Sequence, residues 1–306
     1  MTEEAKTACV LRLFGAPETA VKAVVERFPA QWQITAEWKS RGAETLVALS
    51  AQSPAGLKKA SQALRERFSA DLYGAGERTL AEAAVDALEQ HDRLFICSDA
   101  AAGTLLEARL ETIAGAEKVF DFGALSYAHP KTGAQLEQQA RTHLPKEGAD
   151  PVRLALARAQ AGLRVVGCDL AAGCAEREHA CVLILCDRKG CWLRTVPLEE
   201  RPALWLLDMI RRAACGLPQA GGTSWQRYRA PVPAALLQPA DPAALSASAP
   251  PRRRHRLRKV ILLLAVLALA ALAAGWYYTG GDLAALPQKL QSLGAESLPH
   301  SGAKLI

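Results

Sequence analysis

The residues best placed to do chemistry lie in a short loop, 98–104, between an apolar segment and a helical one. The loop reads SDAAAGT, so it offers two hydroxyl groups, the carboxylate of Asp99 and one glycine. The first strand-to-helix loop of an α/β fold is a favoured ligand site, because free backbone N–H groups at the helix N-terminus bind anions. Asp99 stands where a helix cap is expected. Cys97 ends the apolar segment, where a thiol is typically buried and unreactive.

The cysteines are a second group of reactive side chains. Six of the eight fall between 168 and 215, with His179 among them. A zinc site would be marked by C-x2-C pairs, and the spacings here do not provide them. Cys181 and Cys186 flank VLIL, and an offset of five in a strand places them on opposite faces. We therefore expect structural thiols and no metal or cofactor, with a zinc site as the weaker alternative. The eight are Cys9, Cys97, Cys168, Cys174, Cys181, Cys186, Cys191 and Cys215.

The elements that must position these groups form two units. Residues 1–75 predict a small β-α-β-β-α domain. Segments in which apolar and polar residues alternate indicate strands, and the amphipathic segments between them, which begin near prolines, indicate helices. This unit holds no obvious catalytic cluster. Its expected elements are a strand at 7–14, a helix at 17–28, a hairpin of strands 34–40 and 44–51, and a helix at 54–68.

Residues 76–216 predict an α/β sandwich with a largely buried sheet, since strand and helix patterns alternate. The first helix opens with Thr79 and Glu82, the spacing of a capping box. The expected strands are 93–97, 118–127, 163–168, 180–186 and 191–196, and the expected helices are 79–90, 103–113, 133–143, 150–161 and 198–215.

The charge of the chain is concentrated after this second unit. Residues 217–251 are rich in Pro, Ala and Ser and predict a tether. The run RRRHRLRK at 252–259 holds six of the 37 basic residues, so the other 31 balance the 31 acidic ones and the run carries the whole net charge of +6. A charge confined to one run argues against a nucleic-acid-binding surface. The six cations are Arg252, Arg253, Arg254, Arg256, Arg258 and Lys259.

A single transmembrane helix is expected over 260–279. Nineteen residues without a charge begin at Val260, and as a helix they are roughly 28 Å long, enough to cross a bilayer core. A buried core helix is the alternative, which an apolar surface on all sides disfavours. Because the cations precede the helix, residues 1–259 are expected on the cytoplasmic side of a bacterial inner membrane, in contact with its lipids, and the tail 280–306 outside.

The run TLLEARLETIAGAEKVFDFGALSY at 104–127 resembles the C-terminal domain of the CinA family, the nicotinamide-nucleotide amidases. That family has A-E-S-C-T-G-G before a matching L-L-x-A-R-L. The resemblance continues at 148–161 and at 171–174, where the family has T-G-I-A-G-P. Residues before 76 resemble the KH-like middle domain of CinA proteins. The resemblance covers roughly 9–216 and implies a KH-like domain followed by a CinA C-terminal-like domain.

This resemblance places the family's nucleophilic serine on Ala100, which has no nucleophilic atom. The family's glutamate falls on Asp99, its first motif glycine on Gly103 and its second on Thr104. A serine mechanism needs an oxygen on this loop, so the match implies lost activity.

Three further positions complete the ligand-binding set that the resemblance implies, beside Asp99, Gly103 and Thr104. Tyr127 matches the family's tyrosine. Lys131 lies four residues after it, where the family's lysine lies five after, so equivalence needs a one-residue shift. Gly173 falls in the second loop, which has lost the family's hydroxyl and proline.

Three functions remain open. The favoured one is a membrane-anchored, catalytically inactive CinA-like protein that binds a protein partner or a nucleotide in the old pocket. The second is an amidase acting on nicotinamide mononucleotide with a relocated nucleophile, Ser98, and with Tyr127 and Lys131 as weak catalytic candidates. The third is a structural module of an inner-membrane assembly. Self-association into homo-oligomers is implied by the resemblance.

Overall fold

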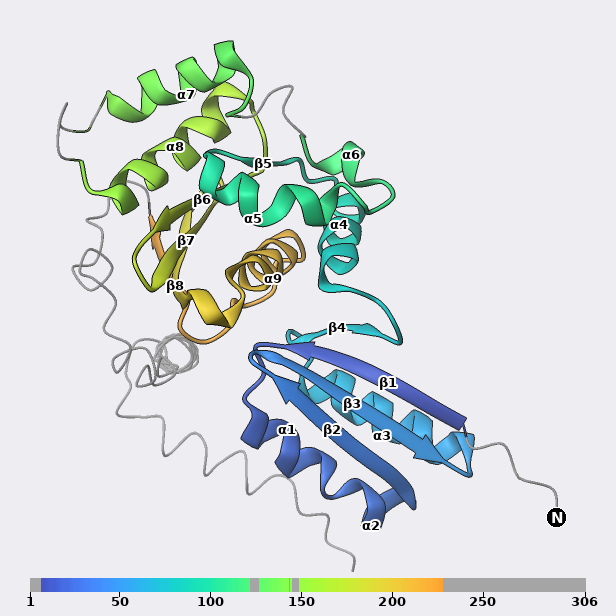
Figure 1. Ribbon diagram of the computed structural model, residues 1–306. Coiled ribbons are helices and arrows are strands. Elements are labelled where there is room, and N and C mark those ends of the chain that lie inside the picture. Colours follow the sequence, from blue (N-terminus) through green and yellow to red (C-terminus); the bar gives the residue numbers. More distant parts are fainter. Residues whose placement is uncertain (1–6, 122–126, 143, 145–148, 228–306) are drawn as a thin grey trace, which may run out of the picture. The chain divides into compact units, whose positions relative to one another are not determined.

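The computed structural model describes residues 7–121, 127–142, 144 and 149–227. All of them lie in the first of two compact bodies, 1–250 and 251–306, so both predicted units belong to that body. They form a mixed α/β structure with two sheets (Figure 1). The basic run, the expected transmembrane helix, the tail and the tether after residue 227 lie outside the described residues. In the part of the chain that is described, no helix is both long and apolar enough to cross a membrane.

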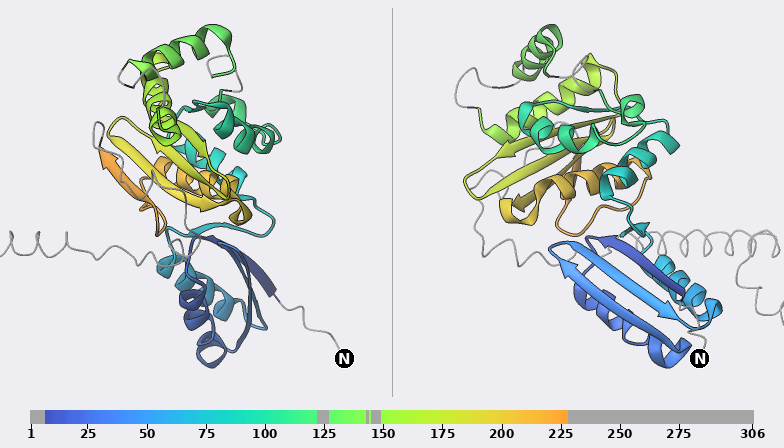
Figure 2. Two further views of the ribbon diagram at one scale, coloured as in Figure 1. Left: turned by 60° about the vertical axis from the view of Figure 1, so that its left-hand side comes forward. Right: turned by 45° about the vertical axis from the view of Figure 1, so that its right-hand side comes forward.

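The first sheet is antiparallel, with strand order β2-β3-β1-β4. The predicted hairpin is confirmed, and Arg41 pairs with Glu44 at its turn. Its strands are β1 (Thr7–Phe14), β2 (Ile34–Arg41), β3 (Glu44–Ala51) and β4 (Leu72–Ala75). The helices that cover one face of it (Figures 1 and 2) are α1 (Glu18–Val25), α2 (Phe28–Trp32) and α3 (Pro54–Arg67).

Two features of this unit differ from the prediction. The helix expected over 17–28 is divided into α1 and α2, because Pro29 has no N–H to donate to an earlier carbonyl and is tolerated only in the first turn of a new helix. The strand β4 was not predicted, since four residues are too short to show a period. Its register against β1 shifts between Arg12 and Leu13.

The core of the first unit follows the period of two along the strands. Alternate residues of β1 and β3 point toward the helices, as in Leu11 and Leu13 against Leu57 and Leu64. Arg12, between these two leucines, is partly exposed and lies 3.7 Å from the carboxylate of Glu44.

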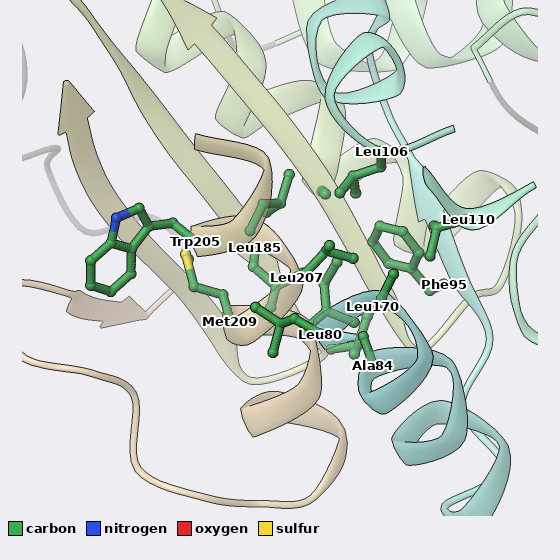
Figure 3. Close-up of a cluster of buried hydrophobic side chains, with 14 of the residues drawn as sticks. Leu80, Ala84, Phe95, Leu106, Leu110, Leu170, Leu185, Trp205, Leu207 and Met209 are labelled. Carbon is green, nitrogen blue, oxygen red and sulfur yellow. The ribbon is translucent and has the colours of Figure 1, made fainter. Parts of the chain in front are cut away.

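The second sheet is mixed, with order β5-β6-β7-β8-β9; β5 and β6 are parallel and the other pairs antiparallel. Leu183 and Leu185 of β7 pack in the core formed with α4, α5 and α9, whereas Val182 and Ile184 pack on α8. Figure 3 shows Leu80, Leu106, Leu185 and Leu207 in the first of these cores. The strands are β5 (Phe95–Cys97), β6 (Leu170–Glu176), β7 (Ala180–Cys186), β8 (Gly190–Pro197) and β9 (Ser224–Arg227), and the helices are α4 (Leu80–Gln90), α5 (Ala100–Leu110), α6 (Ala116–Val119), α7 (Pro130–Arg141), α8 (Pro151–Val165) and α9 (Pro202–Ala214).

The expected strand 163–168 is wrong, and the expected strand 118–127 is wrong at its start and otherwise only partly described. Residues 163–165 belong to α8, and the strand lies instead at β6, with Gly167 in a left-handed conformation between them. The resemblance implied a loop at 171–174, but these small residues form a strand that packs against α8 on one face and α5 on the other. In the segment 118–127, residues up to Val119 are helical, Phe120 makes one bridge to Phe95, and 122–126 lie outside the described residues.

The end of the second unit is also more structured than the sequence indicated. The helix expected over 198–215 consists of a short 3-10 turn (Leu198–Glu200) and α9, separated by Arg201 at a φ of 58°. After α9, the strand β9 pairs with β8 inside the segment expected to be a tether. The tether therefore does not begin at 217.

The cysteines are mostly buried, but not all are thiols. A disulfide joins Cys186 and Cys191, which face each other across the β7–β8 hairpin, so the expectation of eight thiols is wrong for this pair. Cys181 packs with the α9 side of the sheet and Cys186 with the α8 side, which confirms their opposite faces. Over the described residues, no group of three or more His, Cys, Asp or Glu is arranged to hold a metal ion.

Candidate functional site

The loop that the sequence singled out is only two residues long. The strand β5 ends at Cys97, and α5 begins at Ala100, three residues before the predicted start. The early start has a local cause: Oδ1 of Asp99 accepts a hydrogen bond from the Ala102 N–H at 2.8 Å and so caps the helix.

Asp99 is also bound to the neighbouring strand. Its Oδ2 accepts from the backbone N–H of Cys174 in β6 at 3.1 Å. The side chain is buried, and this burial raises the pKa of the carboxyl to about 6, while the Ala102 and Cys174 N–H groups and Arg158 act in the opposite direction. The helix N-terminus, which would otherwise attract an external anion, therefore already holds a carboxylate of the chain itself.

The two positions considered for a nucleophile differ in exposure. Ala100 is exposed on the first turn of α5 and carries only a methyl group. Ser98 is buried at 2% exposure, and its hydroxyl donates to the carbonyl of Ala172 at 2.7 Å. The hydroxyl of Thr104 donates back to the Ala100 carbonyl at 2.9 Å, within its own helix. Each of these hydroxyl groups is bonded inside the protein.

Gly103 and Gly133 are needed for the position of Tyr127. A Cβ on Gly103 would lie 2.2 Å from the Tyr127 hydroxyl oxygen, and a Cβ on Gly133 would lie 2.5 Å from the Tyr127 carbonyl oxygen. The Tyr127 hydroxyl donates to Glu107 at 3.2 Å. Partial burial, together with the Glu107 carboxylate, raises the pKa of Tyr127 to about 12, so the phenol stays protonated at neutral pH.

Gly173 does not lie in a ligand loop, as the resemblance implied, but inside β6. A Cβ there would lie 2.9 Å from Oδ2 of Asp99 and 3.0 Å from the Ala155 carbonyl oxygen. The glycine is thus explained by the close approach of Asp99 and α8 to the strand.

These residues surround a cavity of about 260 Å³, called here the small cavity. It brings together Ser98, Asp99, Ala100 and Tyr127. Lys131 is exposed on the first turn of α7 and is not part of the lining, and Thr104 is exposed as well. The lining residues are Ser98, Asp99, Ala100, Tyr127, Gly133, Leu136, Glu137 and Arg158.

Sequence reasoning missed Glu137 and Arg158. Nε of Arg158 donates to Glu137 at 2.8 Å, and Arg141 donates to the other oxygen of the same carboxylate. Although burial alone raises it, the two arginines lower the pKa of Glu137 overall. The spacing of Glu137 and Arg141, four residues apart on a helix, was a usable signal for the pair. Nothing local in the sequence brings Arg158 to it.

The described part of the small cavity does not assemble a nucleophile and a base. Its acids accept hydrogen bonds from backbone N–H groups or arginines, and its serine bonds a backbone carbonyl. Cys97 is fully buried behind the loop, and burial raises the pKa of its thiol well above the ordinary value.

Neither a scan against models of protein families nor a search of the curated proteins finds a match. Among solved structures, the chain is similar to a crystal structure of a competence or damage-inducible protein from Enterobacter asburiae, at 12% identity and a TM-score of 0.33, over 45% of this chain and 99% of that chain.

Proposed function

We propose that this chain is a CinA-like protein without amidase activity, which acts as a binding or scaffolding module held on the cytoplasmic face of a membrane. The observation that carries the inactive state is Ala100. The sequence match assigns this position to the nucleophile, and it opens α5 at the small cavity with no oxygen or sulfur atom.

Ser98, the hydroxyl residue nearest to position 100 in the sequence, also argues against amidase activity. For Ser98 to act as the nucleophile, its hydroxyl would have to leave the Ala172 carbonyl and turn out of a buried position. That change would leave a buried carbonyl without its side-chain donor, although the backbone N–H of Ser98 also donates to it at 2.8 Å. The relocated-nucleophile amidase therefore ranks second.

The membrane part of the proposal rests on the sequence. The apolar segment from Val260 and the basic run before it support a single helix with residues 1–259 on the cytoplasmic side. The proposal includes contact with membrane lipids, a protein partner and self-association. Binding of a nucleotide in the small cavity would distinguish a binding module from a purely structural one.

The test of inactivity uses the full chain in detergent micelles. Incubation with nicotinamide mononucleotide is expected to release no ammonia above a buffer control, and Ser98→Ala is expected to behave identically. Turnover by the wild-type chain would overturn the proposal. If Ser98→Ala then abolished that turnover, the relocated nucleophile would be established.

A second experiment addresses the anchor. The full chain is expected to remain in the membrane after carbonate extraction, and a variant lacking 260–278 is expected in the supernatant. Replacing the six cations of the basic run by glutamine is expected to disturb orientation, read by protease access, while leaving the thermal unfolding of the rest unchanged. A wild-type chain that carbonate extracts would contradict the anchor.

Thermal unfolding with a nucleotide panel distinguishes the two non-enzymatic roles. A rise in the midpoint with one nucleotide, lost in Arg158→Gln, would favour a binding module, because ligand binding to the folded state raises its stability. No rise with any member of the panel favours the structural module.

A further inference from the structure

A larger cavity lies at the opposite end of α5. It has a volume of about 610 Å³, within the range of about 300–1,000 Å³ typical of small-molecule sites. One wall comes from β1, β3 and β4 of the first sheet, and the other from α4, the C-terminal end of α5 and the start of α9. This cavity is called here the arginine cavity. The residues that line it are Arg12, Phe14, Glu44, Tyr73, Thr79, Leu80, Ala81, Arg109, Thr112, Ile113, Arg201, Leu204 and Leu207.

The charged groups on the first-sheet wall satisfy one another. Arg12 lies 3.7 Å from the Glu44 carboxylate and donates through Nε to the Gly76 carbonyl at 2.6 Å. The Tyr73 hydroxyl donates to the same carboxylate. Burial, followed by the Glu44 contact, raises the pKa of Tyr73 well above its ordinary value, so it stays a hydrogen-bond donor.

The opposite wall presents two guanidinium groups without such partners. Within the described residues, the side chains of Arg109 and Arg201 form no ion pair and no hydrogen bond. Arg109 lies in the last turn of α5, and Arg201 precedes α9. The arginine cavity thus has three cations and one carboxylate, and the carboxylate is already paired with Arg12.

Apolar side chains separate the two walls. Leu80 and Leu207 belong both to the cavity lining and to the core cluster of Figure 3, so the floor of the cavity is the edge of that core. Phe14, Ile113 and Leu204 extend the apolar surface. A ligand that fills this space would have an anionic end and an apolar or ring-shaped part.

We propose that the arginine cavity binds a small phosphate monoester, with the phosphate on Arg109 and Arg201 and the organic part against the apolar floor. Two open guanidinium groups offer the forked donors that phosphate oxygens accept in pairs. A second anionic group at the far wall would meet the Glu44 carboxylate, which favours a ligand with a single charged end. This site is separate from the small cavity and does not depend on the loss of amidase activity.

Arginine labelling tests the site directly on the full chain in micelles. Phenylglyoxal modifies accessible guanidinium groups, and mass spectrometry reads each position. Phenyl phosphate at about ten times its dissociation constant is expected to slow modification of Arg109 and Arg201 about tenfold. Phenol should not protect them, inorganic phosphate should protect them less, and Arg164, exposed on α8, should react at an unchanged rate.

Three outcomes would overturn the proposal. The first is no protection at about 10 mM phenyl phosphate, well above a weak dissociation constant of about 1 mM. The second is equal protection by inorganic phosphate, which would remove the apolar floor from the site. The third is that both arginines are already unreactive without any ligand, which would mean that the chain fills the cavity itself.

Variants give an independent measurement by calorimetric titration of phenyl phosphate. Arg109→Gln and Arg201→Gly are each expected to weaken binding at least about tenfold, the effect of losing one charge-assisted hydrogen bond. Glycine suits position 201 because the backbone there is left-handed, so the fold is kept. Arg164→Gln is the matched control. Wild-type affinity in both cavity variants would contradict the assignment.

Discussion

A cavity lies at each end of α5, and the two differ in whether the charged group at that end is paired within the protein. At the N-terminal end, the carboxylate of Asp99 accepts hydrogen bonds from Ala102 and Cys174, so the partial positive charge of the helix is met internally. At the C-terminal end, Arg109 also suits the helix dipole, but its guanidinium has no partner among the described residues. Each of these charges has the sign that the helix dipole favours at its end, but only the Arg109 guanidinium is available to a ligand.

The cavities are also built differently. The small cavity lies among α5, α7 and α8 around the second sheet. The arginine cavity depends on contacts between the first sheet and α9, which a buried ion cluster holds together. Arg212 donates to Asp208, to Asp71 at 2.9 Å and to the Phe14 carbonyl at 2.9 Å, and Arg211 donates to Asp208 and to the Ala70 carbonyl, both at 2.6 Å. Removing one ion should therefore affect the two cavities unequally.

Asp208→Ala is expected to have the largest effect. It leaves the guanidinium groups of Arg211 and Arg212 buried with less charge compensation, and the free energy of unfolding should fall by about 3–5 kcal/mol. Denaturant unfolding of the full chain in micelles measures the loss, and phenyl phosphate protection of Arg109 should disappear with it.

Asp86→Ala is the matched control, because its pair with Arg78 is partly exposed. Its loss should stay below about 1 kcal/mol. Equal effects of the two substitutions would show that the Asp208 cluster does not hold the arginine cavity together.

Asp99→Asn is expected to alter how stability depends on pH. The folded-state pKa of about 6 lies above the ordinary value of 3.8, so the contribution of Asp99 is fully present below about pH 4 and is lost as the pH rises through 6. The difference amounts to roughly 3 kcal/mol at most. Asparagine keeps an acceptor for Ala102 and does not titrate, so the variant should gain on the wild type between these pH values.

Denaturant unfolding at a series of pH values measures this difference. A stability difference that moves the other way, with the wild type gaining as the pH rises, would show that the backbone donors outweigh the burial of Asp99. The carboxylate of Asp99 would then meet the N-terminal end of α5 even more fully, and the contrast with the arginine cavity would be stronger.

The glycines around Tyr127 give a smaller effect with a clear order. Gly133→Ala places a Cβ 2.5 Å from a backbone oxygen, so α7 must shift, and the loss should be about 1–3 kcal/mol. Gly103→Ala meets mainly the end of the Tyr127 side chain, which can move, and alanine adds up to about 1 kcal/mol of helix propensity. Thermal unfolding should rank Gly133→Ala as the more harmful, and the reverse order would place Tyr127 elsewhere.

The contrast between the cavities also explains what the sequence could predict. Ser98, Asp99 and Ala100 of the small cavity belong to one contiguous loop and helix start, so a short motif identified them, whereas Glu137 and Arg158 come from α7 and α8 and were missed. The arginine cavity draws on residues from Arg12 to Leu207, which no local pattern relates. The arginine cavity exists because the first sheet packs on α9, and no local sequence motif predicts packing between segments so far apart in the chain.

The same reasoning applies to the fold. The hairpin, the capping box at Thr79 and the opposite faces of β7 were predicted because period and capping are local. The strands β4 and β9 are four residues each and obtain their hydrogen bonds only from a neighbouring strand. Similarly, β6 is a strand because helices and strands surround it, which overrides the weak preference of its small residues.

The smallest expected effect concerns Arg201 and tests why a strained residue lines the arginine cavity. A non-glycine residue at a φ of 58° is strained by about 1 kcal/mol, which glycine relieves, while glycine also gains about 0.5–1 kcal/mol of freedom in the unfolded chain. Arg201→Gly should therefore leave stability unchanged or slightly higher. Arg201→Ala, which keeps the strain and removes the same guanidinium, should be less stable than Arg201→Gly by a few tenths of a kcal/mol. If alanine were instead the more stable variant in thermal unfolding, the backbone would have relaxed. If both substitutions clearly destabilised the chain, the guanidinium would be a structural group rather than one open to a ligand.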